Sequence, residues 1–378
     1  MKPLSNVTVL DLTVNTPGPF CSMILGDLGA RVIKVEPPGG DPLRVTSPGM
    51  WTSLNRGKES IVLDLKNNHG RQLLAKLARE ADVVLEGWRP GVATRLGADF
   101  PTLSVHNGGL VYCSISGFGQ DGPWRDRSGH DLNYLALTGY LGVQTAIEGR
   151  PWPPAVLLSD LASGLYAAVM VLAAINGRNV SGKGAYLDLS MAETVLSLLG
   201  LELGETERTG GIGRGPNVSF IPTYGLFQCA DGRWLSLGIV HEDHFWSRFC
   251  AVAGLDDLAD LDFGRRLAQS ESLVQRLEAI FLSLPSAEWD RRLGDADVPA
   301  AVVLDLNETL NSTHFLSREA FVDVDGDKFV APPVKFSTGS VSPEKAPPAL
   351  AEHTDRILHE FGYSPDESTE LRDSGAFG

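Results

Sequence analysis

Short apolar runs alternate along the first half of the chain with longer segments in which apolar residues recur every three or four positions. The runs are typical of buried strands, and the longer segments have the period of helices. The pattern predicts strands at 7–12, 31–36, 60–65, 82–86, 110–115 and 185–189, and helices at 17–29, 70–81, 92–96 and 160–175. This alternation indicates an α/β fold, with a mostly parallel sheet covered by helices on both faces and functional sites at the carboxyl ends of its strands.

The pattern changes after residue 203, where the first part of a large α/β domain (1–203) ends. Residues 204–223 are glycine-rich and predict an exposed linker. The next segments flank Asp231-Gly232 and then Asp325-Gly326, two hairpin signals with helices and one strand between them. They predict a smaller α+β domain at 224–330. Proline-rich residues 331–378 form an extended return that contains a last helix at 353–361.

Composition and charge limit the kinds of ligand and the cellular locations that we expect for the protein. The 378 residues are 43% apolar and 21% charged, as in a soluble globular protein, and the net charge of −15 argues against broad binding to nucleic acid or anionic membranes. No targeting segment is evident, and we expect no apolar run long enough to span a bilayer. The four cysteines lack metal-type spacing, so we expect buried free thiols, no metal site and a cytoplasmic location.

The first strand–helix–strand unit carries Glu36 at the end of its second strand, where a nicotinamide-binding fold would hold a ribose. Its first turn has no G-x-G-x-x-G, and Pro17 and Pro19 remove backbone donors, which argues against a nicotinamide cofactor. Cations do cluster near the predicted strand ends. They are either scattered surface charges or a phosphate site, and they comprise Arg56, Lys58, Lys66, Arg89 and Arg95.

Two titratable residues stand at the starts of predicted helices. His130 follows a glycine-punctuated loop at 116–123, and Asp160 begins the small-residue helix 160–175, which is apolar nearly all round and expected to be buried. Taken singly, His130 could be a packed or capping histidine and Asp160 a helix N-cap. Together they could share one pocket and exchange a proton with a bound substrate.

Five stretches carry a family resemblance that runs from end to end, at 25–36, 56–66, 117–123, 181–184 and 352–358. In them the chain resembles the class III (formyl-CoA transferase-like) CoA-transferase family. The segment Gly129-His130-Asp131-Leu132-Asn133-Tyr134 is similar to the α-methylacyl-CoA racemase branch, because the transferases usually carry another residue at the position of His130. The resemblance implies an acyl-CoA substrate, no cofactor beyond its CoA moiety, and an interlocked homodimer. It also implies that the C-terminal segment completes the large domain and that active sites lie between the domains of two chains.

For the racemase branch, the resemblance implies racemisation of 2-methylacyl-CoA thioesters through an enolate, with His130 and Asp160 as the two acid/base groups. A small-domain glutamate supports the histidine in such relatives, which points to Glu242, with His241 and Asp243 as rivals. The implied CoA-binding residues are Arg56, Leu63, Asp64, Leu65, Lys66, Arg89, Arg95, Gly129, Asp131, Leu132, Asn133 and Tyr134. Pro37 stands where relatives often have an arginine, and Arg44 is a candidate substitute.

Two other functions stay open. In a CoA-transferase, Asp160 would be the nucleophile that forms acyl-anhydride and CoA-thioester intermediates, and only His130 and its surroundings would discriminate this from racemisation. A non-catalytic CoA-binding protein would be expected to lack one of the acid/base residues, and both are present.

Overall fold

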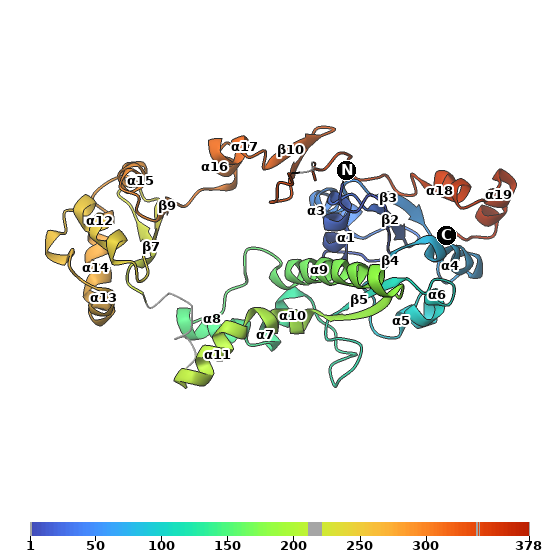
Figure 1. Cartoon of the computed structure of the whole chain (residues 1–378), viewed down its shortest axis with the longest axis horizontal. Helices are drawn as coiled ribbons and strands as arrows, with labels where there is room; N and C mark the ends of the chain where they lie inside the picture. The colour runs from blue at the N-terminus through green and yellow to red at the C-terminus, as the bar shows by residue number, and fades with distance from the viewer. Residues whose placement is uncertain (1, 211–220, 338, 340, 378) are drawn as a thin grey trace. The chain divides into compact units, whose positions relative to one another are not determined.

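The computed structural model describes residues 2–210, 221–337, 339 and 341–377 (Figure 1). The chain divides into a large unit, formed by 1–142, 152–198 and 314–378, and a smaller unit, formed by 143–151 and 199–313. These boundaries differ from the predicted small domain at 224–330. Residues 211–220 of the predicted linker lie outside the described residues, and its first part belongs to the helix α11 (Gly200–Thr209).

The hairpin of β10 (Phe321–Val324) and β11 (Asp327–Val330) belongs to the large unit rather than to the smaller one. Contacts with Arg56 account for this. Its guanidinium lies 5.6 Å from the centre of the Phe329 ring and donates to the carbonyl of Val330 at 3.4 Å.

A six-stranded sheet organises the large unit, and its strands are parallel and ordered β3-β2-β1-β4-β5-β6. The predicted α/β fold is therefore confirmed. Its strands are β1 (Thr8–Asp11), β2 (Arg31–Glu36), β3 (Glu59–Val62), β4 (Val83–Glu86), β5 (Val111–Ser116) and β6 (Ala185–Ser190). The strand order reverses between β1 and β4, so the loops after Asp11 and Glu86 diverge and leave a crevice at the carboxyl ends of the strands.

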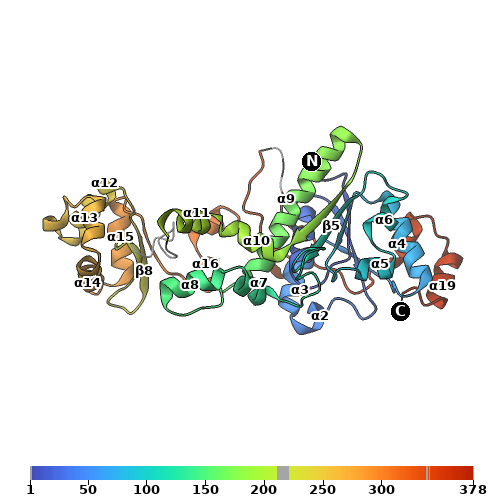
Figure 2. The ribbon, with the colours of Figure 1, turned by 90° about the horizontal axis from the view of Figure 1, so that it is seen from below.

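Helices cover both faces of this sheet, with α9 on one side and α4 and α6 on the other (Figure 2). On the first face Leu25 of α1 packs with Ala167 and Val171 of α9, and on the second Leu73 and Leu77 of α4 meet the sheet. The helices of this unit are α1 (Pro17–Asp27), α2 (Leu43–Thr46), α3 (Pro48–Asn55), α4 (Asn68–Glu80), α5 (Val92–Leu96), α6 (Phe100–Ser104), α7 (Asp131–Leu137), α9 (Leu158–Ser181), α10 (Met191–Leu198), α17 (Thr313–Ser317), α18 (Thr354–Glu360) and α19 (Pro365–Asp373). The helix α8 (Tyr140–Glu148) begins in this unit and ends in the smaller one.

The C-terminal segment is held to the rest of the large unit by hydrogen bonds with β3 and with the residues that follow it. The carbonyl of Ala376 accepts from the amide of Asp64 at 2.8 Å, and the ring of His353 accepts from the amide of Ser60 at 3.2 Å. The segment therefore closes the edge of the sheet that β3 forms.

The helix α9 differs from its prediction in two ways. It has 24 residues and is, by length and composition, apolar enough to cross a membrane, so the statement that no run is long enough is wrong. It is also buried on one face only. Small residues let that face approach α1, since a Cβ at Gly164 would lie 2.5 Å from the carbonyl oxygen of Pro17. The opposite face exposes Leu165, Tyr166, Val169 and Met170.

The smaller unit is a three-stranded antiparallel sheet of β7 (Tyr224–Gln228), β8 (Trp234–Gly238) and β9 (Ala300–Val302). Aromatic side chains of the helices Asp243–Ala253, Ser270–Phe281 and Ser286–Asp295 fill its core, among them Trp246, Phe281 and Trp289. The smaller unit also contains α11, a 3₁₀ turn at Asp256–Leu258 and the helices α13 (Phe263–Ala268) and α16 (Leu306–Leu310). All four cysteines of the chain are free and buried, as predicted.

Candidate active site

A cavity of about 550 Å³ lies at the point where the strand order of the large sheet reverses. Its walls are the loops 13–18, 87–90, 115–117 and 125–131, together with side chains from the start of α9. His130 and Asp160, far apart in the sequence, both line it. The structure thus brings the two predicted acid/base residues to one cavity.

Asp131 links the helices that carry these two residues. Its carboxylate, in the first turn of α7, accepts the amides of Ser159 at 2.7 Å and Asp160 at 3.2 Å. The N-cap position of α9 is held by Leu157, which has no capping side chain, so Asp131 satisfies these helix amides instead. Asp160 is therefore not the N-cap, and its own carboxyl group is left for the cavity.

The surroundings of Asp160 favour its neutral form more than water does. Burial, and then the nearby charge of Asp131, raise the pKa of Asp160 to about 6, while a hydrogen bond with the Thr16 side chain and the proximity of His130 act in the opposite direction. A carboxyl group with a pKa near the operating pH can both give and take a proton.

Contacts around His130 explain the presence of Gly129, Asn133 and Tyr134 near it in the sequence. The amide of His130 donates to Oδ1 of Asn133 at 3.0 Å, and its carbonyl accepts from the Asn133 amide at 2.8 Å. The Tyr134 hydroxyl donates to the carbonyl of Gly129 at 2.7 Å. A Cβ at Gly129 would lie 2.7 Å from the tyrosine ring, so only glycine leaves room for this packing.

Three arginines line the same cavity, although only Arg89 was among the predicted CoA-binding residues. Arg89 donates to Oγ of Ser128 at 2.7 Å, which joins the loop after β4 to the loop before His130. Arg125 and Arg127 come from that second loop. Because they stand five and three residues before His130, they could have been predicted from the sequence as residues of the same site. The cavity is therefore suited to an anionic ligand.

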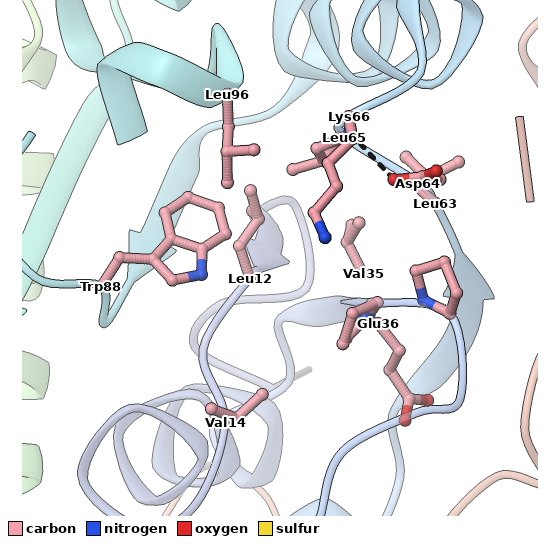
Figure 3. Close-up of a pocket in the computed structure, with 12 residues that line it drawn as sticks. Leu12, Val14, Val35, Glu36, Leu63, Asp64, Leu65, Lys66, Trp88 and Leu96 are labelled. Atoms are coloured by element: carbon pink, nitrogen blue, oxygen red, sulfur yellow. Dashed lines mark hydrogen bonds between the residues drawn. The ribbon is translucent and has the colours of Figure 1, made fainter. Parts of the chain in front are cut away.

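A second cavity, of about 400 Å³, opens beside β1, β2 and β3 (Figure 3). It holds four of the predicted CoA-binding residues, at 63–66, and shares Val14 and Trp88 with the first cavity. Figure 3 shows the Lys66 side chain reaching toward Leu12 and Val35, with Trp88 on the opposite side. Most of the lining of this second cavity is apolar, with Lys66 as a cation within it, and the three arginines line the adjoining first cavity.

Several predicted cations are engaged elsewhere. Arg56 is buried and pairs with Asp27 at 2.6 Å, and Lys58 is buried against Asp11 at 3.0 Å. Neither lines the two cavities. Arg44, the candidate substitute at Pro37, pairs with Glu36 at 2.7 Å and stacks on the Trp51 ring. These three cations have a structural role, because each of them forms an ion pair with a buried carboxylate.

The other predicted binding residues divide between the cavity and its surroundings. Gly129, Asp131 and Tyr134 line the first cavity, whereas Leu132, Asn133 and Arg95 belong to the lining of neither. Asn133 acts on the backbone of His130, as described above. Among the described residues, no group of three His, Cys, Asp or Glu is arranged to hold a metal ion.

Glu242 lies in the smaller unit, at the N-cap position of α12 (Asp243–Ala253). Its Oε2 accepts from the amide of Val240 at 3.1 Å, within its own loop. Of its two rivals, Asp243 pairs with the buried guanidinium of Arg266 at 2.9 Å, whereas His241 is exposed. Asp243 thus has a structural partner of its own.

The structure is thus an α/β protein with a parallel sheet, and the crevice at its switch point is lined by His130, Asp160 and arginines. The sequence model of CoA-transferase family III matches residues 4–354, and the chain belongs to this family. The family resemblance predicted from the motifs is confirmed.

Relatives with two different activities are equally similar to the chain. The α-methylacyl-CoA racemase of Homo sapiens is 32% identical over 376 residues, which cover 97% of this chain and 96% of the relative. The acetyl-CoA:oxalate CoA-transferase of Acetobacter aceti is 33% identical over 375 residues, with 95% and 96% covered. A crystal structure of a CAIB/BAIF family protein from Brucella suis superposes with a TM-score of 0.87 at 27% identity, covering 95% of this chain and 99% of that one. Family members are thus enzymes that act on CoA thioesters, either as racemases or as CoA-transferases.

Proposed function

We propose that the protein is an α-methylacyl-CoA racemase-like isomerase, which inverts the α-carbon of a 2-methylacyl-CoA thioester through an enolate. The observation that carries this proposal is the shared cavity of His130 and Asp160. Inversion needs one group to remove the α-proton and a second to return a proton to the opposite face. A transferase that uses Asp160 as its nucleophile has no such need for an imidazole at the same cavity.

In this mechanism His130 takes the α-proton of one enantiomer while the Asp160 carboxyl group protonates the enolate from the other side. The roles are reversed for the other enantiomer. The pKa of Asp160, raised to about 6 by burial and by Asp131, makes both of its protonation states accessible near neutral pH. The arginine rim and the adjoining apolar cavity would accommodate the CoA moiety.

We also propose that the enzyme works as an interlocked homodimer in the cytoplasm. Besides the exposed apolar residues of α9, Leu196 and Leu198 of α10 are exposed in the large unit, and Leu201 and Leu203 of α11 are exposed in the smaller unit. Exposed apolar surface of this kind marks an interaction site. A dimer could place Glu242 of one chain against His130 of the other. Sedimentation-equilibrium analysis should give twice the mass of the chain, and a monomeric, active enzyme would contradict this part of the proposal.

A CoA-transferase remains the second candidate, because a transferase relative is as similar to the chain as a racemase relative is. Asp160 would then attack the acyl-CoA carbonyl, and its ionised carboxylate would be the reactive form.

Deuterium incorporation separates the two candidates. The wild-type enzyme and the variant His130→Ala would be incubated in D₂O with 2-methylacyl-CoA thioesters of different chain lengths. The control is His106→Ala, at an exposed histidine that does not belong to the cavity lining. We expect one α-deuteron per turnover in wild type and control, and at least about a hundredfold loss in His130→Ala. Undiminished exchange in that variant would remove His130 from the mechanism. Parallel assays with free oxalate or succinate as acceptor should show no transfer of CoA, and rapid transfer would favour the second candidate.

A further inference from the structure

Glu86, the last residue of β4, is a buried carboxyl group that the proposed reaction does not use. Its side chain is 4% exposed, and among the described residues it forms no ion pair with lysine or arginine. One oxygen, Oε2, accepts the amide of Trp88 at 2.8 Å. A hydrogen bond with the Ser114 side chain also contributes, and Ser114 in turn accepts from the side-chain amide of Gln120 at 2.8 Å.

The amide that Glu86 holds belongs to the segment between the two cavities. Trp88 lines both of them, and its indole ring faces Leu12 and Lys66 in Figure 3. Arg89, the next residue, reaches across to Ser128, two residues before His130. The conformation of residues 87–89 therefore affects the wall of both cavities at once.

We propose that Glu86 is a positioning residue of the acyl-CoA site, whose carboxylate fixes the 87–89 turn and thereby places Trp88 and Arg89 for binding the CoA moiety. The assignment of the ligand rests on the proposed function, whereas the effect of Glu86 on the turn does not. A carboxylate forms a stronger hydrogen bond to an amide than a neutral carboxylic acid does. Loss of its charge should therefore loosen the turn.

The groups that face Glu86 are neutral or acidic. They come from β5, from β6 and from the start of α6, and comprise Tyr112, Cys113, Tyr186, Asp188 and Asp99. Gly91 lines the same cavity as Glu86, and the guanidinium groups of Arg95 and Arg125 lie 3.5 and 3.9 Å from the position that a Cβ on Gly91 would take. Burial, and then the charge of Asp188, raise the pKa of Glu86 to about 7. A third cavity, of about 300 Å³, borders Glu86 and gives protons a route to it.

This arrangement predicts that ligand affinity follows the ionisation of Glu86. Above pH 7 the carboxylate is charged and the turn is fixed, and below pH 7 the group gains a proton and the affinity falls. Glu86→Gln keeps an oxygen that accepts from Trp88 but carries no charge at any pH. Glu86→Leu removes the acceptor altogether. Glu80→Gln, at an exposed glutamate of α4, is a matched control.

The test is calorimetric titration of the full-length protein with coenzyme A between pH 6 and pH 8.5. The ratio of the dissociation constants of Glu86→Gln and wild type cancels the titration of the ligand itself. We expect this ratio to rise about three- to tenfold from pH 6 to pH 8, whereas Glu86→Leu binds at least about tenfold more weakly than wild type at pH 8. The control should match wild type throughout. Equal affinities of wild type and Glu86→Leu, or a ratio that does not change with pH, would overturn the inference.

A second measurement needs no ligand. The fluorescence difference between wild type and Trp88→Phe reports the surroundings of the Trp88 ring, and we expect it to change with a midpoint near pH 7. The same difference measured in the Glu86→Gln background should be flat between pH 6 and pH 8.5, and an unchanged transition there would contradict the assignment. If this transition is present but coenzyme A does not bind, the proposed function fails and the role of Glu86 in the turn stands. If coenzyme A binds equally well to every variant, the role of Glu86 fails and the proposed function stands.

Discussion

Replacing Lys58 by methionine would remove the nearest cation from the buried carboxylate of Asp11, directly beneath the loop that forms one wall of the candidate site. The ammonium donates to Asp11 at 3.0 Å, to Asn55 at 2.9 Å and to the carbonyl of Pro19 at 3.1 Å. The two charged side chains are 1% and 0% exposed. Burial alone would raise the pKa of Asp11, but the charges of Lys34 and Lys58 outweigh it and hold that pKa below its usual range.

Removing one partner of a buried ion pair destabilises a protein by about 3–5 kcal/mol, because the other charge stays behind without compensation. We expect about 3 kcal/mol here, the lower end, since Asp11 keeps hydrogen bonds from Thr13 and Ser22 and the charge of Lys34. The loop 13–19 also carries Thr16, whose side chain hydrogen-bonds with Asp160, so catalytic activity should fall as well.

Urea unfolding followed by circular dichroism at pH 7 measures this loss. The exposed pair of Lys335 and Glu319, 3.4 Å apart, supplies the control, and Lys335→Met should cost at most about 0.5 kcal/mol. Adding Asp11→Asn to Lys58→Met should recover part of the loss, because the stranded charge disappears. A loss below about 1 kcal/mol for Lys58→Met, or strictly additive losses in the double variant, would refute the reasoning.

Two further predictions concern the loops around the cavity. Gly129→Ala should destabilise the protein by about 1–3 kcal/mol in urea unfolding, because the new methyl group would meet the Tyr134 ring. Gly142→Ala should not destabilise it, because a Cβ at Gly142 would have open space around it. Asp131→Asn keeps an oxygen for the amides of α9 but removes the like charge that raises the pKa of Asp160. The limb of the pH–activity profile that reports Asp160 should therefore move about half to one unit toward lower pH, and an unmoved limb would contradict the coupling.

The sheet could be predicted from the sequence because the strands β1 to β5 are almost entirely buried and therefore appear as short apolar runs, whereas β6 alternates between half-buried and exposed residues. The strand predicted at 31–36 has the bounds of β2. The helix predicted at 160–175 continues to Ser181, because Gly177 is tolerated within the helix and the left-handed Gly182 ends it. The short helices at 43–55 were not predicted, since they present too few turns for a periodic pattern.

The candidate site was predicted in part. The motif around His130 and the start of α9 are local signals, and the structure places them on one cavity. Whether an arginine pairs with a buried carboxylate or lines the cavity depends on residues that are distant in the sequence. Arg56 forms an ion pair with Asp27, 29 residues earlier in the chain, and no pattern within the motif at 56–66 indicates that pairing. Arg125 and Arg127, which line the cavity, could have been predicted from their place five and three residues before His130.

The surroundings of Asp160 suit both candidate reactions, so His130 is the residue on which the two separate. A carboxyl group with a pKa of about 6 is mostly ionised above neutral pH, as a nucleophile must be, and yet gains a proton readily enough to act as an acid. A substitution at Asp160 would abolish either reaction and could not tell them apart. Transfer of CoA through an acyl-aspartyl intermediate requires no second proton-exchanging group, whereas inversion of a carbon centre does. The loss of α-proton exchange in His130→Ala, with folding intact, would therefore identify the reaction, because no step of the transferase route predicts it.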